Sequence, residues 1–178
     1  MGFKVKKSNS VRLLVLTAVV FLLVAAGCTT GFDKSTLANM EYIIDITESG
    51  RADLVNGVYE EAAAAGSVSK IIVRLDDSGA IGDIDGDGIS DSAVILQAEG
   101  GGSGTFLYLA VVLNQTGGPA ALEAVFLGDR ILIERVGISE GVIQVDIIDR
   151  KNGESMSVSP SVKKELFFQL VNGAVVEK

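Results

Sequence analysis

Hydrophobic residues follow two different patterns along the chain. Residues 13–26 form one uncharged, mainly apolar run, which follows a basic stretch at residues 1–12. From residue 41 onwards the apolar residues occur in short runs, rich in β-branched side chains and separated by turns that contain Gly, Asn or Asp. Short strands with turns about every eight to twelve residues are typical of antiparallel β-proteins. We therefore expect residues 41–178 to form one mainly β domain with little helix, built as a sandwich, a barrel or a single curved antiparallel sheet.

Two of the expected strands, at 92–98 and 105–114, are apolar at nearly every position. Such runs suit central strands that are covered on both faces. In the segment 142–148 apolar and polar residues alternate, so one face of that strand should contact solvent. Two Asn-Gly pairs, at 56–57 and 172–173, predict tight hairpin turns. The other expected strands are 42–47, 52–60, 68–75, 121–127, 131–138, 165–171 and 174–177.

Helix is expected in two short segments only. One is a single turn over residues 35–40 with Ser35 as its N-cap, and the other is 60–65, whose sequence EEAAAA favours helix. The sequence contains no internal repeat, which argues against a complete propeller.

The N-terminal apolar run has the properties of a secretion signal. It is shorter than the roughly 17–25 residues that a membrane-spanning helix needs, and it has the length of a signal-peptide core. The small residues Ala25, Ala26 and Gly27 directly precede Cys28. This arrangement resembles the lipobox of bacterial lipoproteins, although Ala25 stands where Leu is more usual. The resemblance implies that residues 1–27 are a signal helix that is cleaved off, and that Cys28 becomes the lipid-modified first residue.

A lipid on Cys28, with palmitate among its acyl groups, would anchor the protein to a membrane on the side away from the cytoplasm. Residues 28–40 would then be the lipid anchor and a short tether that keeps the domain near the membrane surface. In a two-membrane cell, lipoproteins without Asp after the cysteine are usually sent to the outer membrane, and here the residue is Thr29. The periplasmic side of the outer membrane is the expected location in such a cell. The alternative is that the apolar run is an uncleaved membrane anchor.

The charge balance narrows the choice of partners. The leader contains four of the 15 Lys and Arg residues and none of the 23 Asp and Glu residues, so the rest of the chain is strongly acidic. Such a surface repels polyanions, which argues against nucleic acid as a partner, and it attracts cations. The chain contains one Cys and no His. An intrachain disulfide, a Cys–His zinc site and a His-based catalytic triad are therefore excluded.

Residues 83–91, DIDGDGISD, form the motif with the clearest chemistry. Carboxylates occupy positions 1, 3, 5 and 9 of this string, with Gly at position 6, and this is the ligand order of calcium-binding loops. We expect one structural calcium ion here. The expected ligands are Asp83, Asp85, Asp87, Ile89 through its backbone carbonyl, and Asp91 directly or through water.

The motif is not a complete EF-hand. Val94 stands at position 12, where an EF-hand has a bidentate Glu, and the residues that follow predict a strand rather than a helix. The loop is more similar to those that join two strands in integrin-type propeller repeats. Without the twelfth-position ligand we expect a modest affinity, which suits the calcium concentrations outside the cytoplasm. The alternative is an acidic turn without metal, although four carboxylates in nine residues repel one another unless a cation neutralises them.

Three other motifs have weaker functional interpretations. Residues 100–104, GGGSG, lack the Gly-Lys-Ser/Thr ending of a phosphate-binding loop and are expected to be a flexible hairpin connection. Ser-x-x-Lys occurs at 67–70 and 161–164, but without the accompanying motifs of penicillin-recognising enzymes. Asp129 and Arg130, which are adjacent in sequence, are expected to mark a solvated turn rather than an ion pair.

Four strings resemble those of a family of uncharacterised bacterial exported proteins and lipoproteins. They are NGVY at 56–59, GDIDGDGISDSAVIL at 82–96, GGSGTFLYLAVVLN at 101–114 and FLGDR at 126–130, and together they extend over most of the domain. The resemblance implies an envelope location and a calcium-type loop, in which relatives often have Asn at the position of Asp85. It implies no activity. Some relatives stand beside small envelope domains of the lysozyme-inhibitor kind, which is a weak association.

We therefore expect a membrane-anchored, calcium-binding, non-catalytic envelope or interaction module, whose partner would be another envelope protein or a glycan. One alternative is a hydrolase of cell-wall or glycan material that uses Asp76 with Asp77, or Glu60 with Glu61. Adjacent strand residues point to opposite faces, however, and make poor acid–base pairs. Another alternative is a periplasmic inhibitor of a hydrolase. An acidic cleft would favour the enzyme, and a protruding loop would favour the inhibitor.

Overall fold

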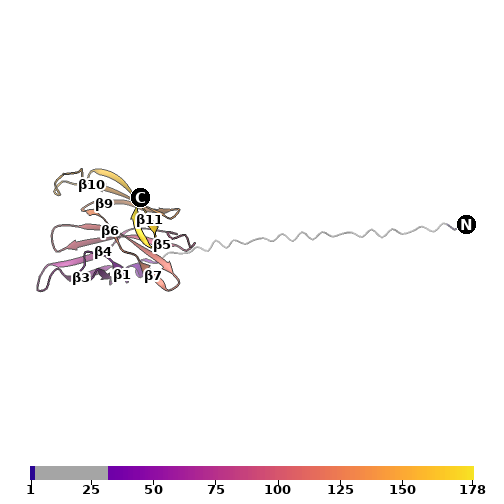
Figure 1. Cartoon of the computed structure of the whole chain (residues 1–178), viewed down its shortest axis with the longest axis horizontal. Coiled ribbons are helices and arrows are strands. Elements are labelled where there is room, and N and C mark those ends of the chain that lie inside the picture. Colours follow the sequence, from indigo (N-terminus) through magenta and orange to yellow (C-terminus); the bar gives the residue numbers. More distant parts are fainter. Residues whose placement is uncertain (3–31) are drawn as a thin grey trace.

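The computed structural model describes residues 1, 2 and 32–178 of the chain. Residues 32–178 form a mainly β domain with antiparallel sheets and very little helix, which confirms the predicted fold class (Figure 1). The expected signal helix and the lipid-modified Cys28 lie outside the described residues.

The domain begins with α1, a single helical turn at Lys34–Leu37, and continues entirely in strands. These are β1 (Glu41–Ile43), β2 (Arg51–Asp53), β3 (Val58–Ala62), β4 (Lys70–Gly82), β5 (Asp91–Gly100), β6 (Phe106–Gln115), β7 (Gly118–Ala121), β8 (Val125–Asp129), β9 (Leu132–Ser139), β10 (Val142–Asp149), β11 (Val162–Val171) and β12 (Ala174–Glu177).

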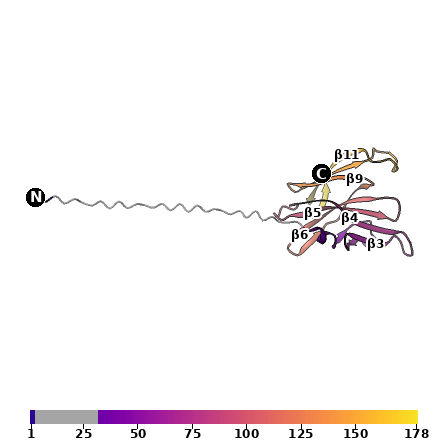
Figure 2. The same cartoon turned by 180° about the vertical axis from the view of Figure 1, so that it is seen from behind.

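The described strands form three antiparallel sheets. The largest has the order β3-β4-β5-β6-β7, and β8 pairs with β6 along the same edge as β7. A second sheet has the order β12-β11-β10-β9, and β1 with β2 forms a small third sheet. Figures 1 and 2 show the second sheet lying over one face of the largest sheet, with β1 on the opposite side. The domain is therefore a β-sandwich with an additional small layer.

The central strands β5 and β6 are buried on both faces. One face contributes Leu96 and Ala110 to a hydrophobic core that also contains Tyr42 of β1. The other face contributes Ile95 and Leu109 to a second core, which is shared with β10 and β11. This arrangement explains the nearly continuous apolar sequence of both strands, because neither face contacts solvent. The prediction of two doubly covered central strands is confirmed.

Both hydrophobic cores are built from residues between Phe32 and Val175. The segment from Thr29 onwards therefore contains both cores and every described helix and strand. We use this segment as the folding unit in the experiments below.

The predicted alternation in the second sheet is confirmed. Ile143, Val145 and Ile147 of β10 are buried in the second core, while the residues between them are partly exposed. The predicted turn at 172–173 is also confirmed, since both residues have positive φ angles and connect β11 to β12. Residues 56–57 turn the chain in the same way. The segment 52–60 nevertheless contains parts of two strands, β2 before the turn and β3 after it, which belong to different sheets.

The prediction of a helix at 60–65 is wrong. The first half of this segment is the end of β3, which pairs with β4. Backbone pairing with a neighbouring strand outweighs the helix propensity of the alanines, which is a small term per residue. The helical turn near residue 35 is present, but Asp33 rather than Ser35 is its N-cap and accepts a hydrogen bond from Thr36 N.

β4 is longer than the strand predicted at 68–75. It continues to Gly82, with an irregularity in its pairing between Leu75 and Gly79. A bulge of this kind carries the chain past unpaired residues without ending the strand. β4 therefore leads directly into the predicted calcium loop.

Candidate metal centre

The predicted calcium loop is the connection between the neighbouring strands β4 and β5. Gly82, the last residue of β4, pairs with Asp91, the first residue of β5. Between them Gly86 and Gly88 adopt positive φ angles of 85° and 84°. Because residues with a side chain rarely adopt this conformation, the glycines of the motif allow the sharp turn. As predicted, strands rather than helices flank the loop.

Three of the predicted ligands come together at this turn. Carboxylate oxygens of Asp83, Asp85 and Asp91 all lie within 4.8 Å of one another. The loop backbone orients the first of them, since Gly86 N donates to Asp83 Oδ1 at 2.7 Å and Gly88 N donates to Asp83 Oδ2 at 3.0 Å. A carboxylate oxygen has a second lone pair, so it can accept such a bond and still coordinate a cation.

Asp91 also stabilises the fold, in addition to its place in this cluster. Its side chain is buried, with the residue only 1% exposed. Asp91 Oδ2 accepts a hydrogen bond from Ile84 N at 2.8 Å, and Asp91 Oδ1 accepts one from Asn114 N at 2.8 Å. The carboxylate thereby joins the loop to β6. The sequence pattern predicted Asp91 as a ligand but did not reveal these bonds, since Asn114 is distant in sequence.

Partial desolvation and repulsion between carboxylates both act on the cluster. The pKa of Asp85 is raised above its ordinary value, first by partial desolvation and then by the negative charges of Asp91, Asp87 and Asp83. A hydrogen bond from Asp87 N acts in the opposite direction. The ionised form of Asp85 is therefore disfavoured in the chain by itself. A bound divalent cation would reverse this effect, because opposite charge favours the ionised carboxylate.

Asp87 does not belong to the group of three converging carboxylates. Its Oδ1 instead accepts a hydrogen bond from Ile89 N at 2.7 Å, within the loop. The ligand roles of Asp87 and of the Ile89 carbonyl therefore stay predictions.

The loop packs against the second sheet as well as joining β4 to β5. Ile84 is 4% exposed and belongs to the core that is shared with β10 and β11. A cavity of about 520 Å³ lies between residues 82–86 and the turn that joins β9 to β10. At Gly82 an added Cβ would lie 2.8 Å from Ile138 Cγ2 of β9. The sequence does not predict this anchoring, because Ile84 is an isolated apolar residue between two aspartates.

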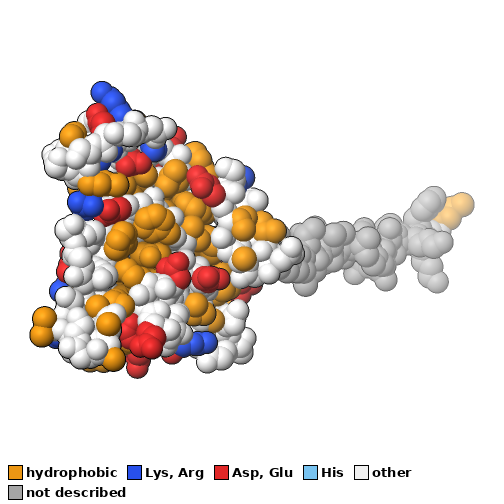
Figure 3. Space-filling model, turned by 60° about the vertical axis from the view of Figure 1, so that its left-hand side comes forward, with side chains coloured by type: hydrophobic (Ala, Val, Ile, Leu, Met, Phe, Trp, Pro, Cys, Tyr) orange, Lys and Arg blue, Asp and Glu red, His pale blue; other side chains and the backbone are white. Residues whose placement is uncertain are grey.

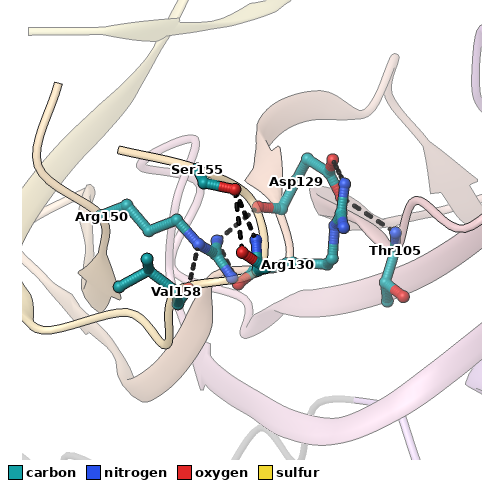
Figure 4. A network of polar contacts seen from close by, with 7 residues as sticks. Thr105, Asp129, Arg130, Arg150, Ser155 and Val158 are labelled. Atoms are coloured by element: carbon teal, nitrogen blue, oxygen red, sulfur yellow. Dashed lines mark hydrogen bonds and ion pairs between the residues drawn. The ribbon is translucent and has the colours of Figure 1, made fainter. Parts of the chain in front are cut away.

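The prediction for Asp129 and Arg130 is wrong, because they do form an ion pair. Arg130 Nη2 donates to Asp129 Oδ2 at 2.8 Å, and Thr105 N donates to Asp129 Oδ1 at 3.0 Å (Figure 4). Arg150 approaches from the segment after β10 and donates to the Arg130 carbonyl at 3.0 Å and to the Val158 carbonyl at 2.5 Å. These contacts tie the β8–β9 corner to the long connection between β10 and β11. We interpret this network as structural.

The carboxylates of the hydrolase alternative each have separate partners. Asp77 pairs with Lys34 and Glu60 pairs with Lys70. Glu61 accepts hydrogen bonds from Tyr59 and from the backbone of Glu48, and Asp76 accepts one from the backbone of Ser78. On the face shown in Figure 3 the acidic side chains lie in several separate groups among hydrophobic ones. The residues at 101–104 connect β5 to β6, as expected for a hairpin connection.

Comparisons with protein-family models, with curated proteins and with solved structures find no match to this chain. Among the described residues, no helix has the length and the apolar character needed to cross a bilayer. Function is therefore inferred from the chemistry of the site.

Proposed function

We propose that this chain is a lipid-anchored, non-catalytic protein of the cell envelope whose domain is stabilised by calcium. The observation that supports the calcium site most strongly is the convergence of Asp83, Asp85 and Asp91 at the turn between two neighbouring strands. Calcium takes six to eight hard oxygen ligands at about 2.3–2.6 Å, and carboxylates supply such oxygens. Asp87, the Ile89 carbonyl and water would complete the coordination.

The ion would act on the fold. Ile84 and Asp91 of the loop reach the second core and β6, so a cation that holds the loop closed also holds these contacts together. Removal of the cation leaves carboxylates that repel one another. The pKa of Asp85 is accordingly raised, first by desolvation and then by the charges of its acidic neighbours. A cation that binds the folded chain alone raises the free energy of unfolding by about 2.7 kcal/mol at a hundredfold excess over Kd.

The anchor is the second part of the proposal. Cys28 carries the lipid, and the domain stands close to the membrane, since Asp33 already caps α1 of the fold. The resemblance to exported bacterial proteins supports a position outside the cytoplasm, on the periplasmic side of the outer membrane where the cell has two membranes. The partner in this proposal is another envelope protein or a glycan.

Titration calorimetry tests the metal site. The segment from Thr29 onwards, treated first with a chelator, should bind one calcium ion per chain with measurable heat. Magnesium should bind more weakly, because it retains its water and resists this many protein ligands. If calcium gives no heat, the loop is an ordinary acidic turn and the calcium proposal is wrong.

Labelling with radioactive palmitate tests the anchor. The full chain should incorporate the label in a bacterial cell, and Cys28→Ser should incorporate none and keep residues 1–27, since the thiol is the attachment point. Thr29→Ser is the matched control and should be labelled and processed normally. Labelling of the Cys28→Ser variant would contradict the lipoprotein assignment.

A further inference from the structure

A second cavity lies on the other face of the largest sheet, away from the metal centre. Its volume is about 370 Å³, and it lies between α1 and the bulge of β4. Pockets for small ligands in proteins have volumes of about 300–1,000 Å³, so this groove has room for a small molecule. We call it the α1 groove, and its lining includes Phe32, Leu37, Leu75, Ile81, Ser92 and Val94.

The pairing of β4 with β5 explains why the groove is open. Gly79 pairs with Val94 and Ile81 pairs with Ser92, and directly paired residues have side chains on the same face of a sheet. Gly79 has no side chain to cover Val94, and Ile81 is 58% exposed at the edge of the groove. The floor is therefore formed by the buried side chains of Ser92 and Val94, with Leu37 from α1 beside them.

Ser92 supplies the observation that points to a ligand. The residue is 1% exposed, and its Oγ is the one buried side-chain polar atom in the described part of the chain without a hydrogen-bond partner. A buried hydroxyl without a partner is costly, and such groups are rare in folded proteins. Ser92 lines the α1 groove, and its Oγ is buried, so a polar group within the groove reaches it only after a small displacement of the side chains around it.

The charges around the groove define what kind of molecule fits. The floor is uncharged, and the rim carries Asp76, Asp77 and Lys34. Lys34 pairs with Asp77, which leaves the rim with an excess of negative charge. An anionic ligand would be repelled by this rim, and a charged group of either sign would be poorly solvated at the floor. Charge therefore favours a neutral molecule.

We propose that the α1 groove binds a small neutral amphiphile, an aliphatic chain with one hydroxyl group. The ligand hydroxyl forms a hydrogen bond with Ser92 Oγ, and the aliphatic chain packs against Leu37, Leu75 and Val94. None of the lining residues of the groove is a proposed metal ligand, but Ser92 directly follows Asp91 in the chain, so the test keeps calcium at a fixed concentration.

The experiment uses 1-hexanol as the probe and hexanoate as a control of similar length with a negative charge. Backbone amide resonances of the segment from Thr29 onwards are followed by NMR, with calcium present throughout. Hexanol should produce saturable shifts at Leu37, Gly79 and Val94, and hexanoate should bind at least about tenfold more weakly because of the acidic rim. Absence of saturable hexanol shifts, or equal binding of hexanoate, would overturn the proposal.

Two variants test the residues. Ser92→Ala should weaken hexanol binding about fivefold, as expected for the loss of one hydrogen bond, and Ser157→Ala, at an exposed site, should leave it unchanged. Ile81→Trp should block the groove while leaving the melting temperature nearly unchanged, since Ile81 is largely exposed. Hexanol affinity that is unchanged in both groove variants would show that the alcohol binds elsewhere.

Discussion

Asp91 and Asp85 belong to the same cluster, but substitutions at the two positions should have different effects on the stability of the metal-free chain. Asp91 is buried and accepts two backbone hydrogen bonds, from Ile84 N and from Asn114 N, each at 2.8 Å. Asp85 is exposed, and its Oδ1 accepts a hydrogen bond from Asp87 N at 3.1 Å. We therefore expect Asp91→Ala to destabilise the fold even without metal. We expect Asp85→Asn to weaken the response to calcium without destabilising the metal-free chain.

The magnitude follows from the bonds that are lost. A hydrogen bond to a charged group contributes about 1.5–3 kcal/mol, so the loss of two at Asp91 costs at least about 3 kcal/mol. For a domain of this size that corresponds to a fall in melting temperature of about 6–12 °C. Asp85→Asn replaces a carboxylate whose pKa is raised by desolvation and by its acidic neighbours. Its melting temperature in chelator should therefore not fall below that of the parent chain.

The assay is a thermal melt of the segment from Thr29 onwards, followed by circular dichroism in chelator and in excess calcium. Calcium at a hundredfold excess over Kd should raise the parent melting temperature by about 5–10 °C. Asp85→Asn should lose part of this shift, because the amide oxygen can still bind the cation but is a weaker ligand than a carboxylate. Glu165→Gln, which removes one charge at an exposed position of β11, is the matched control and should keep the full shift.

Two results would refute this reasoning. A melting temperature of Asp91→Ala in chelator close to that of the parent chain would mean that the bonds to Ile84 and Asn114 do not support the fold. A full calcium shift in Asp85→Asn would mean that the negative charge of Asp85 does not contribute to cation binding.

Two further predictions concern the contacts around this site. Gly82→Ala should lower the free energy of unfolding by about 1–3 kcal/mol in urea denaturation, because its Cβ would meet Ile138 at 2.8 Å; Gly117→Ala, which has open space around it, should have little effect. The pKa of Asp129 is lowered below its ordinary value of 3.8, mainly by the hydrogen bond from Arg130. The ionised carboxylate therefore stabilises the fold at neutral pH. This contribution is lost as the pH falls through the folded-state pKa. Asp129→Asn should therefore lower stability at pH 7 and make melting temperature less dependent on pH in the acid range, and an unchanged acid dependence would contradict the role of the pair.

Strands covered on both faces could be predicted from sequence because double burial leaves a continuous apolar run. The runs at 92–98 and 105–114 are such cases, and they became β5 and β6. The segment 60–65 misled the prediction, since its alanines favour helix locally while its actual pairing with β4 depends on a partner that follows a turn. The Asn-Gly pair at 56–57 correctly predicted a turn, but a turn does not determine which sheets its flanking strands join.

The candidate metal centre and the α1 groove also combine features that depend on nearby residues with features that depend on residues distant in sequence. The spacing within 83–91 predicted a shared cluster, and Asp83, Asp85 and Asp91 do lie together, because a tight turn keeps these nine residues close to one another. The second role of Asp91 could not be predicted, because its partner Asn114 belongs to β6. The unpartnered hydroxyl of Ser92 could not be predicted either, since it depends on the bulge in β4 that leaves the groove uncovered.

Because β5 and β6 are buried on both faces, the two hydrophobic cores share these strands and should unfold together. In a protein whose two cores share no strand, one core can unfold while the other stays intact. Here the layer that contains Tyr42 and the sheet that contains Phe168 rest on opposite sides of the same two strands. Loss of either covering layer exposes those strands and weakens the support of the other, so intermediate half-open forms are disfavoured. This cooperativity leaves few partly unfolded forms for a protease to cleave.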